Sequence, residues 1–341
     1  MQHAIKLDAL TDKKVILVCG AGGFIGTHLC EHLKSLGHTV VGVDLKYPLY
    51  NDTACDLFHQ QDLRNATTVD TIFENGFQGR KFDEVYQLAA DMGGAGYIFV
   101  GVNDADIMHN SATINLNVLE ACRKYDVKKV FYSSSACMYP QENQTDPDNP
   151  DLAEHTAYPA NPDSDYGWEK LFSERLYQAY ERCYGIEARI ARFHNIFGPR
   201  GSWNNGKEKA PAALCRKVAS APEGGTVDVW GPGTQTRSFL YIDECVEGIM
   251  RIMESDCNEP LNLGSTRKIS INGLVELISQ QCNKSVAINN IDGPLGVMGR
   301  TSDNNLIKQK IGWAPDEDLE TGIKHTYEWI SQQIASGAQD V

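Results

Sequence analysis

The stretch KVILVCGAGGFIG, residues 14–26, decides the fold of this chain. Residues 14–19 form a short and almost continuously apolar run, which is typical of a strand buried on both faces of a parallel sheet. A glycine-rich turn follows, and an amphipathic stretch then continues to Gly37. This order of features predicts a strand, a tight turn and a helix.

The turn has the spacing GxxGxxG, with glycines at 20, 23 and 26, which suits the approach of a pyrophosphate to a helix N-terminus. A tight turn without a ligand also uses glycine, so the wider context decides. Residues 39–43 predict a second strand that ends at Asp44. An acid there holds ribose hydroxyls and disfavours a 2'-phosphate, which predicts NAD rather than NADP.

Asp62 follows a further short extended segment and lies either at the adenine edge of the cofactor or in an exposed loop. A tyrosine and a lysine further along the chain are included among the candidate cofactor contacts. The predicted cofactor contacts are Gly20, Gly23, Phe24, Ile25, Gly26, Asp44, Asp62, Tyr166 and Lys170.

The alternation of strands and helices continues through the first half of the chain. A long helix is predicted at residues 105–125, and further strands at residues 84–88, 129–134 and 186–192. This spacing predicts an α/β fold with a doubly wound parallel sheet of the Rossmann type. We expect residues 1–195 to form an NAD-binding domain, with a returning segment near 235–262.

After Arg192 the pattern changes, and residues 196–341 predict a smaller C-terminal α/β substrate-binding domain, interleaved with the first. A turn is expected at residues 228–233, and helices at residues 243–253, 271–280 and 319–334. Cations in this half are expected to offset the charge of a diphosphate. They are Lys209, Lys217, Arg237 and Arg300.

Composition limits the class of protein. The 341 residues include 31 basic and 45 acidic side chains, a net charge of -14 that argues against general binding to nucleic acid or to a membrane. No apolar run reaches the roughly 18 residues of a membrane span, and residues 1–10 lack a signal-peptide pattern. Ten cysteines without CxxC pairs suit reduced core residues better than a disulfide framework or a metal site. We expect a cytoplasmic protein.

Four groups able to move protons lie within residues 133–170: the hydroxyl of Ser135, the thiol of Cys137, the phenol of Tyr166 and the amine of Lys170. Tyr166 and Lys170 are four residues apart and share one face of a helix. A lysine beside a tyrosine favours the phenolate, whose pKa of about 10 must fall by roughly three units, about 4 kcal/mol, for a base near pH 7. We expect Lys170 and the charge of a bound cofactor to supply that shift.

These groups, the glycine-rich turn and Asp44 together resemble the extended short-chain dehydrogenase/reductase family of nucleotide-sugar enzymes, across nearly the whole chain. The resemblance implies that Tyr166 takes the proton of the sugar C4 hydroxyl while hydride passes to NAD. It also implies that Lys170 holds the nicotinamide ribose and that Ser135 hydrogen-bonds the C4 oxygen. Further motifs that support the resemblance are AADMGG at 89–94, SSACMYP at 134–140, RFHNIFGP at 192–199, EKAPAA at 208–213, QTRSF at 235–239 and SDNNLIK at 302–308.

Within the family, these motifs are similar to those of enzymes that invert two carbons of one sugar. The resemblance implies epimerisation of GDP-D-mannose at C3 and C5 through a transient 4-keto intermediate, giving GDP-L-galactose, with GDP-L-gulose as an open second product. The new ketone acidifies the hydrogens on both flanking carbons. Cys137 corresponds to the base and Lys209 to the acid. A free thiol with a pKa of about 8.5 is mostly protonated near pH 7, so Cys137 needs a cation such as Lys209 nearby.

The same resemblance implies a homodimer, no metal, and a set of contacts to GDP-mannose. Arg237 and Arg300 suit the diphosphate, whereas Ala210 offers only its backbone. The implied substrate contacts are Gly93, Ser135, Ala136, Cys137, Asn195, Glu208, Lys209, Ala210, Lys217, Gln235, Thr236, Arg237 and Arg300.

Other functions are weighed against this one. The epimerase-reductase of GDP-4-keto-6-deoxymannose uses NADPH and a histidine acid, but no histidine occurs between Phe197 and Leu214, and Asp44 disfavours NADPH. Another NAD-dependent nucleotide-sugar epimerase, acting at C4, needs neither Cys137 nor Lys209 for proton transfer. A catalytically silent NAD-binding regulator is expected to have lost the tyrosine or the lysine. Taken singly, Cys137 is more often a core residue and Lys209 a surface charge.

Overall fold

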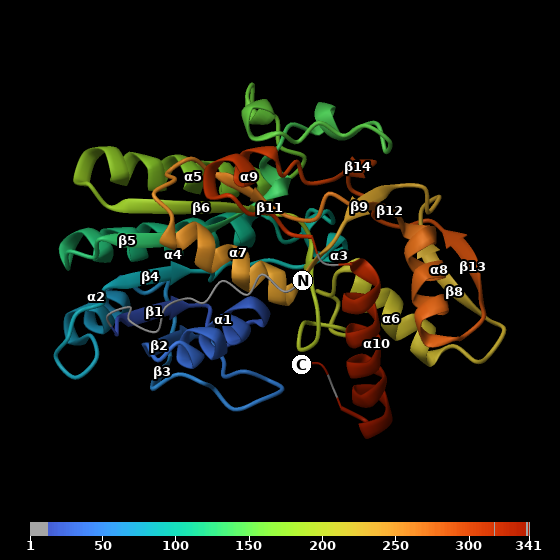
Figure 1. The fold of residues 1–341 in the computed structure, drawn as a ribbon, viewed down its shortest axis with the longest axis horizontal. Helices are drawn as coiled ribbons and strands as arrows, with labels where there is room; N and C mark the ends of the chain where they lie inside the picture. Colours follow the sequence, from blue (N-terminus) through green and yellow to red (C-terminus); the bar gives the residue numbers. More distant parts are fainter. Residues whose placement is uncertain (1–12, 317, 339, 341) are drawn as a thin grey trace.

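A seven-stranded parallel sheet organises the structure, a computed structural model that describes residues 13–316, 318–338 and 340 (Figure 1). The strand order is β11-β6-β5-β4-β1-β2-β3, and every neighbouring pair is parallel. This confirms the predicted doubly wound sheet. Residues 1–10, for which the sequence predicts no signal peptide, lie outside the described residues. The strands are β1 (Val15–Cys19), β2 (Thr39–Asp44), β3 (Leu57–Gln60), β4 (Glu84–Gln87), β5 (Lys129–Ser135), β6 (Glu187–Phe193) and β11 (Leu261–Leu263).

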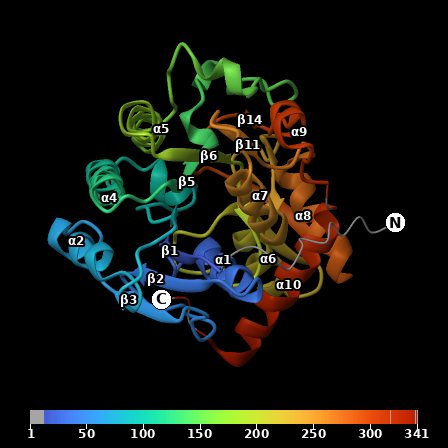
Figure 2. The same cartoon turned by 60° about the vertical axis from the view of Figure 1, so that its left-hand side comes forward.

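Strand β1 contributes to the cores on both faces of the sheet, because its side chains alternate between them. Ile16 and Val18 pack with one set of helices, whereas Leu17 and Cys19 pack with the other. Figure 2 shows α1 and α7 on one side of the sheet and α2, α4 and α5 on the other. These helices are α1 (Phe24–Ser35), α2 (Ala66–Asn75), α4 (Asp104–Lys124), α5 (Asp165–Tyr184) and α7 (Ile242–Glu254).

The strand order reverses at β1, with β2 on one side and β4 on the other. Ligands of open α/β sheets bind outside the carboxyl ends of the strands at such a switch point. The glycine-rich turn, Asp44 and Ser135 all lie at this edge, because they end or follow β1, β2 and β5. The sheet therefore gathers the predicted cofactor and redox residues.

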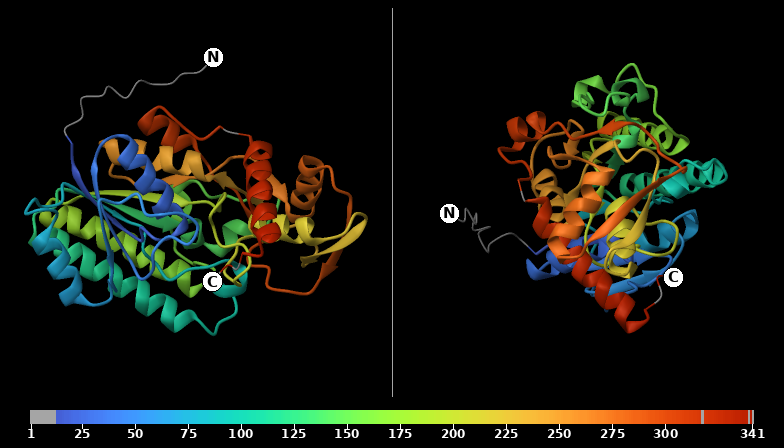
Figure 3. Two further views of the ribbon diagram at one scale, coloured as in Figure 1. Left: turned by 90° about the horizontal axis from the view of Figure 1, so that it is seen from below. Right: turned by 90° about the vertical axis from the view of Figure 1, so that its right-hand side faces the viewer.

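The remaining elements lie beyond that edge of the sheet, as the views of Figure 3 show for α6, α8 and α10. These three helices pack against one another. The same part of the molecule contains three small sheets. They pair β7 with β10, β8 with β13, and β9 with both β12 and β14. The bounds are β7 (Ile196–Phe197), α6 (Ala210–Ser220), β8 (Gly225–Trp230), β9 (Thr236–Ser238), β10 (Leu240–Tyr241), β12 (Lys268–Ser270), α8 (Ile271–Cys282), β13 (Val286–Ile291), β14 (Gly299–Arg300), α9 (Asn305–Ile311) and α10 (Leu319–Ser336).

The turn predicted at residues 228–233 begins later than expected. Strand β8 continues through Trp230, and the backbone turns only at Gly231 and Gly233, both with φ of +73°. Alternating burial of side chains explains the strand, since Val227 and Val229 are buried while Thr226, Asp228 and Trp230 are exposed. The polar residues of β8 and β13 hide this pattern in the sequence.

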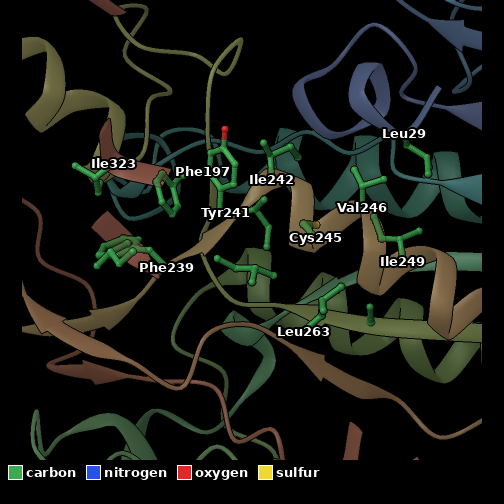
Figure 4. Packing of buried hydrophobic residues seen from close by; sticks show 14 of the residues in the cluster. Leu29, Phe197, Phe239, Tyr241, Ile242, Cys245, Val246, Ile249, Leu263 and Ile323 are labelled. Carbon is green, nitrogen blue, oxygen red and sulfur yellow. The ribbon is translucent and has the colours of Figure 1, made fainter. Parts of the chain in front are cut away.

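Helix α7 packs into a core that the sheet and the outer elements share. Figure 4 shows Ile242, Cys245 and Val246 between Leu29 of α1 on one side and Phe197 near β10 on the other. The same cluster continues to α10 through Ile323. The two parts of the molecule therefore rest on one continuous apolar core.

All ten cysteines are free thiols, and most are buried or half-buried, with Cys183 the exposed one. This agrees with their interpretation as reduced core residues. In the described part of the chain, no helix is long and apolar enough to cross a membrane. No group of three or more metal-ligating side chains occurs among the same residues.

Candidate active site

A cavity of about 970 Å³ opens at the carboxyl edge of the sheet and extends to α6 and to the loop before β14. The glycine-rich turn, the ends of β2 and β5 and the first turns of α5 line its inner part. The segments after β7 and around β9 line its outer part. One cavity therefore contains both the predicted cofactor residues and the predicted substrate residues.

The glycine-rich turn fits a pyrophosphate. Gly20 has φ of +85°, and a Cβ on Gly26 would lie 2.0 Å from the carbonyl oxygen of Gly20, so no larger residue fits there. Gly23 is the N-cap of α1 and provides no side chain to cap the helix, and the first turn carries no acidic residue. The helix N-terminus thus remains open to an anionic group.

Asp44 ends β2 and faces the same turn. Its carboxylate accepts hydrogen bonds from the backbone N–H groups of Gly22, at 3.0 Å, and Lys46, at 3.3 Å. Burial raises the pKa of Asp44, although these donors act against the rise. Asp62 lines the cavity too, and it forms an ion pair with Arg64 at 2.7 Å. These residues fit the ribose and pyrophosphate of NAD.

The redox group predicted from the sequence comes together at the end of β5. The Tyr166 side chain is 6% exposed and hydrogen-bonded to Ser135. The Lys170 ammonium donates to the carbonyl of Ser133 at 2.9 Å and lies 5.6 Å from the centre of the Tyr166 ring. All three side chains line the cavity.

The expected fall in the pKa of Tyr166 is not found in the structure. Burial, and then the charge of Cys137, raise the pKa of Tyr166 well above its ordinary value, while the hydrogen bond with Ser135 acts in the opposite direction. Burial lowers the pKa of Lys170. Among the protein's own groups burial therefore dominates, and the predicted fall in the pKa of Tyr166, which also depends on the charge of a bound cofactor, stays a prediction.

Arg300 contacts the Cys137 sulfur directly. Its Nη1 donates to Sγ at 2.9 Å, its Nη2 to Asp163 at 2.7 Å, and its Nε to Gln144 at 2.6 Å. Burial opposes the charge of Arg300, but attraction to Cys137 and Asp163 outweighs it and raises the pKa of the guanidinium. The sequence assigned Arg300 to a diphosphate and Lys209 to the thiol. In the structure the guanidinium is the cationic group that is hydrogen-bonded to the sulfur.

Lys209 lies at the N-cap of α6 and lines the cavity. Burial lowers its pKa, while attraction to Cys137 and Cys245 acts against that change. Within the described residues, Lys209 has no acidic partner in an ion pair. A desolvated and unpaired ammonium gives up its proton more readily than an exposed one.

The outer part of the cavity presents further cations that lack acidic partners in the described part of the chain, namely Lys217 and Arg237. Lys217 donates to the carbonyl of Asp228 at 2.7 Å. Arg237 donates to the carbonyl of Val297 at 2.6 Å, and burial together with the charge of Arg300 lowers its pKa to about 10. An anionic group bound beside both cations would form charge-assisted hydrogen bonds in place of the water that burial removes.

All but one of the predicted substrate residues line the cavity, and the exception is Thr236. Its hydroxyl donates to the carbonyl of Pro147, away from the cavity. Side chains alternate along β9, so Gln235 and Arg237 face the cavity and Thr236 faces the opposite side. The Thr236 side chain thus lies outside the cavity lining, and its contact with the substrate stays a prediction. The residues within the lining are Gly93, Ser135, Ala136, Cys137, Asn195, Glu208, Lys209, Ala210, Lys217, Gln235, Arg237 and Arg300.

Sequence reasoning missed the residues that support this lining. Asp163 and Gln144 hold Arg300, but both occur in the polar segment before α5, where nothing in the sequence singles them out. His194 is fully buried beside Asn262, and burial lowers its pKa to about 3.

The fold and the cavity define a dinucleotide-dependent enzyme of small molecules, and comparison with known proteins identifies its class. Residues 16–264 match the model of the NAD dependent epimerase/dehydratase family. The chain belongs to this family, and its cofactor is NAD.

Two of the relatives, both from plants, share almost half of their aligned residues with this chain. The GDP-mannose 3,5-epimerase of Arabidopsis thaliana is 46% identical over 322 residues, which are 94% of this chain and 82% of that protein. GDP-mannose 3,5-epimerase 1 of Oryza sativa subsp. indica is 46% identical over 327 residues, 95% of this chain and 83% of that protein. UDP-glucuronic acid decarboxylase 1 of Xenopus tropicalis, by contrast, is 27% identical over 345 residues, 98% of this chain and 76% of that protein.

Solved structures share the whole fold. The UDP-glucose 4-epimerase of Thermotoga maritima, solved with UDP-glucose, superposes with a TM-score of 0.82 at 26% identity and covers 94% of this chain and 99% of its own. The UDP-glucuronic acid 4-epimerase of Bacillus cereus, solved with UDP-glucuronic acid and NAD, has a TM-score of 0.78 at 26% identity. The match covers 93% of this chain and 99% of that chain.

We expect Gly26→Ala to abolish NAD binding, because its Cβ would lie 2.0 Å from the backbone oxygen of Gly20 and would force the turn apart. Calorimetric titration with NAD measures the effect. Ser35→Ala, at the exposed end of the same helix, is the control and should bind NAD like the unaltered protein. Normal NAD affinity in a folded Gly26→Ala protein would remove this turn from the cofactor site.

Arg300→Gln should slow alkylation of Cys137 by iodoacetamide at pH 7 by about tenfold or more, because a hydrogen bond to a charged group contributes roughly 1.5–3 kcal/mol. Mass spectrometry of the Cys137 peptide separates this thiol from the other nine. Arg300→Lys retains a cation and should recover part of the rate. An unchanged rate in Arg300→Gln would show that the guanidinium does not control the thiol.

Proposed function

We propose that this chain is a GDP-mannose 3,5-epimerase, which inverts C3 and C5 of GDP-D-mannose through a transient 4-keto intermediate. The observation that carries the proposal is a second pair of proton-transfer groups, Cys137 and Lys209, in the same cavity as Tyr166 and Lys170. A dehydrogenase or 4-epimerase has no use for that second pair. The similarity to the plant GDP-mannose 3,5-epimerases supports the choice of substrate.

The first group of residues acts at C4. When bound, NAD supplies a hydride acceptor there and a positively charged ring, which opposes the burial that raises the pKa of Tyr166. Tyr166 takes the C4 hydroxyl proton and later returns it, and Ser135 keeps the oxygen within hydrogen-bonding reach. Lys170 is held by the carbonyl of Ser133 on the same side of the cavity, where it orients the ribose.

The second group of residues acts at C3 and C5. A ketone at C4 acidifies the hydrogens on both neighbouring carbons, so one base serves both centres. Cys137 removes the proton as a thiolate that Arg300 stabilises. Lys209 then donates a proton from the opposite face, which its lowered pKa favours. Inversion follows because the base and the acid belong to different sides of the sugar, and exchange with solvent removes the proton from Cys137 and restores it to Lys209 before the second carbon reacts.

The diphosphate is assigned to Lys217 and Arg237 rather than to Arg300, whose donors are already taken by Cys137, Asp163 and Gln144. Both cations lie in the cavity without acidic partners among the described residues. They provide local positive charge in a chain with a net charge of -14.

Incubation of the protein with GDP-mannose in deuterated water should place deuterium at C3 and C5 of the sugar, because each inversion exchanges a carbon-bound hydrogen with solvent. Proton and carbon NMR of the sugar measure this directly. Inversion at C4 alone, as in a 4-epimerase, would leave C3 and C5 unlabelled. The absence of deuterium at both positions would refute the proposal.

Cys137→Ser should lower the exchange at C3 and C5 by at least about 100-fold, since a serine hydroxyl is a far weaker base than a thiolate. NAD affinity should stay the same, because Cys137 lies outside the cofactor turn. Cys122→Ser, at a buried thiol near the C-terminal end of α4 and outside the cavity lining, is the control. Exchange at the normal rate in Cys137→Ser would exclude the thiol as the base.

We also propose a homodimer that forms through α4 and α5, which pack side by side. Their outer faces expose large apolar side chains, with Met108 and Leu116 on α4 and Trp168 and Phe172 on α5, each 37–49% exposed. A second copy of the same face would cover them through a two-fold axis. The ten free thiols further support a reducing compartment, and we propose the cytoplasm.

Phe172→Glu should give a monomer, because it would place two charges at the centre of the apolar face. Sedimentation velocity measures the mass. Ile291→Glu, on β13 and far from α4 and α5, is the control and should remain a dimer. A dimer that persists in Phe172→Glu would place the interface elsewhere.

A further inference from the structure

The loop of residues 200–209 joins β7 to α6, contains neither helix nor strand, and ends at Lys209. Its cavity side carries Glu208 and Lys209. Near its start Arg200 forms an ion pair with Glu31 of α1 at 2.6 Å. Near its end the Lys207 carbonyl accepts from the N–H of Gly94 at 2.9 Å. The middle of the loop needs a separate anchor.

That anchor is the carboxylate of Asp340, which follows α10. One oxygen, Oδ2, accepts from the successive N–H groups of Trp203, at 2.5 Å, and Asn204, at 2.7 Å. The other, Oδ1, accepts from the Tyr50 hydroxyl at 2.8 Å and from the Asn205 amide at 3.3 Å. Asp340 thus satisfies four donors, of which three belong to the loop.

Neighbouring contacts make this anchor rigid. The Trp203 ring is 3% exposed, and its Nε1 donates to the same Tyr50 hydroxyl at 3.1 Å. The Trp203 carbonyl accepts from Arg216 on α6 at 2.8 Å, and Arg216 also pairs with Glu208 at 3.2 Å. Two successive N–H groups on one carboxylate form an anion nest, and such charge-assisted bonds are stronger than neutral ones. Figure 1 shows α10 beside this loop.

The anchor matters for chemistry because Lys209 has no ion-pair partner in the described part of the chain. Its ammonium is therefore positioned by the backbone of the loop and by α6. Asp340 itself does not line the cavity. A displacement of roughly 1 Å at a reacting group lowers a rate by about 100-fold.

We propose that Asp340 is a positioning residue for Lys209, holding residues 203–205 so that the ammonium faces the sugar. The inference rests on the proposed epimerase function, in which Lys209 is the proton donor. Removing the carboxylate leaves the NAD turn and the redox group of Tyr166 unchanged, because Asp340 contacts neither. The defect should therefore appear in proton transfer and not in cofactor binding.

The test compares Asp340→Ala and Asp340→Asn with the unaltered protein. Asp340→Ala should lower kcat for epimerisation of GDP-mannose by about 10- to 100-fold, with a smaller change in KM. Asp340→Asn retains an acceptor oxygen but no charge. Its kcat should lie between those of Asp340→Ala and the unaltered protein. The matched control is Glu320→Gln, which removes an exposed carboxylate of α10 that pairs with Arg267 and leaves the loop untouched.

Two further measurements separate positioning from loss of structure. NAD affinity by calorimetry and the absorbance of enzyme-bound NADH during turnover, which reports C4 oxidation, should stay near normal in Asp340→Ala. An unchanged kcat would overturn the inference, as would a parallel loss of NAD binding, which would indicate general unfolding. If the unaltered protein gives no deuterium exchange at C3 and C5, the proposed function fails instead, independently of these variants.

Discussion

The guanidinium of Arg300 is the constraint on which the site depends. A charge that is 5% exposed needs a partner for each of its donors, because burial removes the water that would otherwise satisfy them. Its three partners, Cys137, Gln144 and Asp163, all come from the segment between β5 and α5, and Arg300 itself comes from β14. The requirement to satisfy one cation therefore fixes how the outer elements meet the carboxyl edge of the sheet. It also decides that the Cys137 sulfur faces a positive charge.

Burial acts on the other ionisable groups of the cavity in a consistent direction. It raises the pKa of Tyr166 and lowers the pKa of Lys170, Lys209 and Arg237, so each group is driven toward its neutral form. Groups held in this state respond strongly to a charged ligand, because an opposite charge restores the ionised form. An anionic sugar nucleotide would favour the charged form of these cations, and a cationic nicotinamide ring would favour the phenolate of Tyr166.

The sequence predicted those parts of the structure that local pattern determines. The apolar run and the glycine spacing gave β1 and the turn of Gly20, and the alternation of strands with helices gave the Rossmann-type sheet. Features set by tertiary contact were not predictable in this way. The partner of Cys137 is separated from it by 163 residues, and Asp163 shows no local signal. Thr236 shares a motif with two residues that line the cavity, and only the alternation of side chains along the strand shows that it lies outside the lining.

The apolar core around α7 has a consequence for motion. Leu29 of α1 and Ile323 of α10 belong to the same buried cluster, with Cys245 and Ile249 between them. A hinge between the sheet and the outer elements would have to open this cluster to water, and each large apolar side chain exposed would cost about 1.5–3 kcal/mol. Domain closure of the kind seen in two-lobed binding proteins is thus disfavoured. Exchange of substrate and product depends instead on small movements of loops at the mouth of a cavity whose walls stay in place.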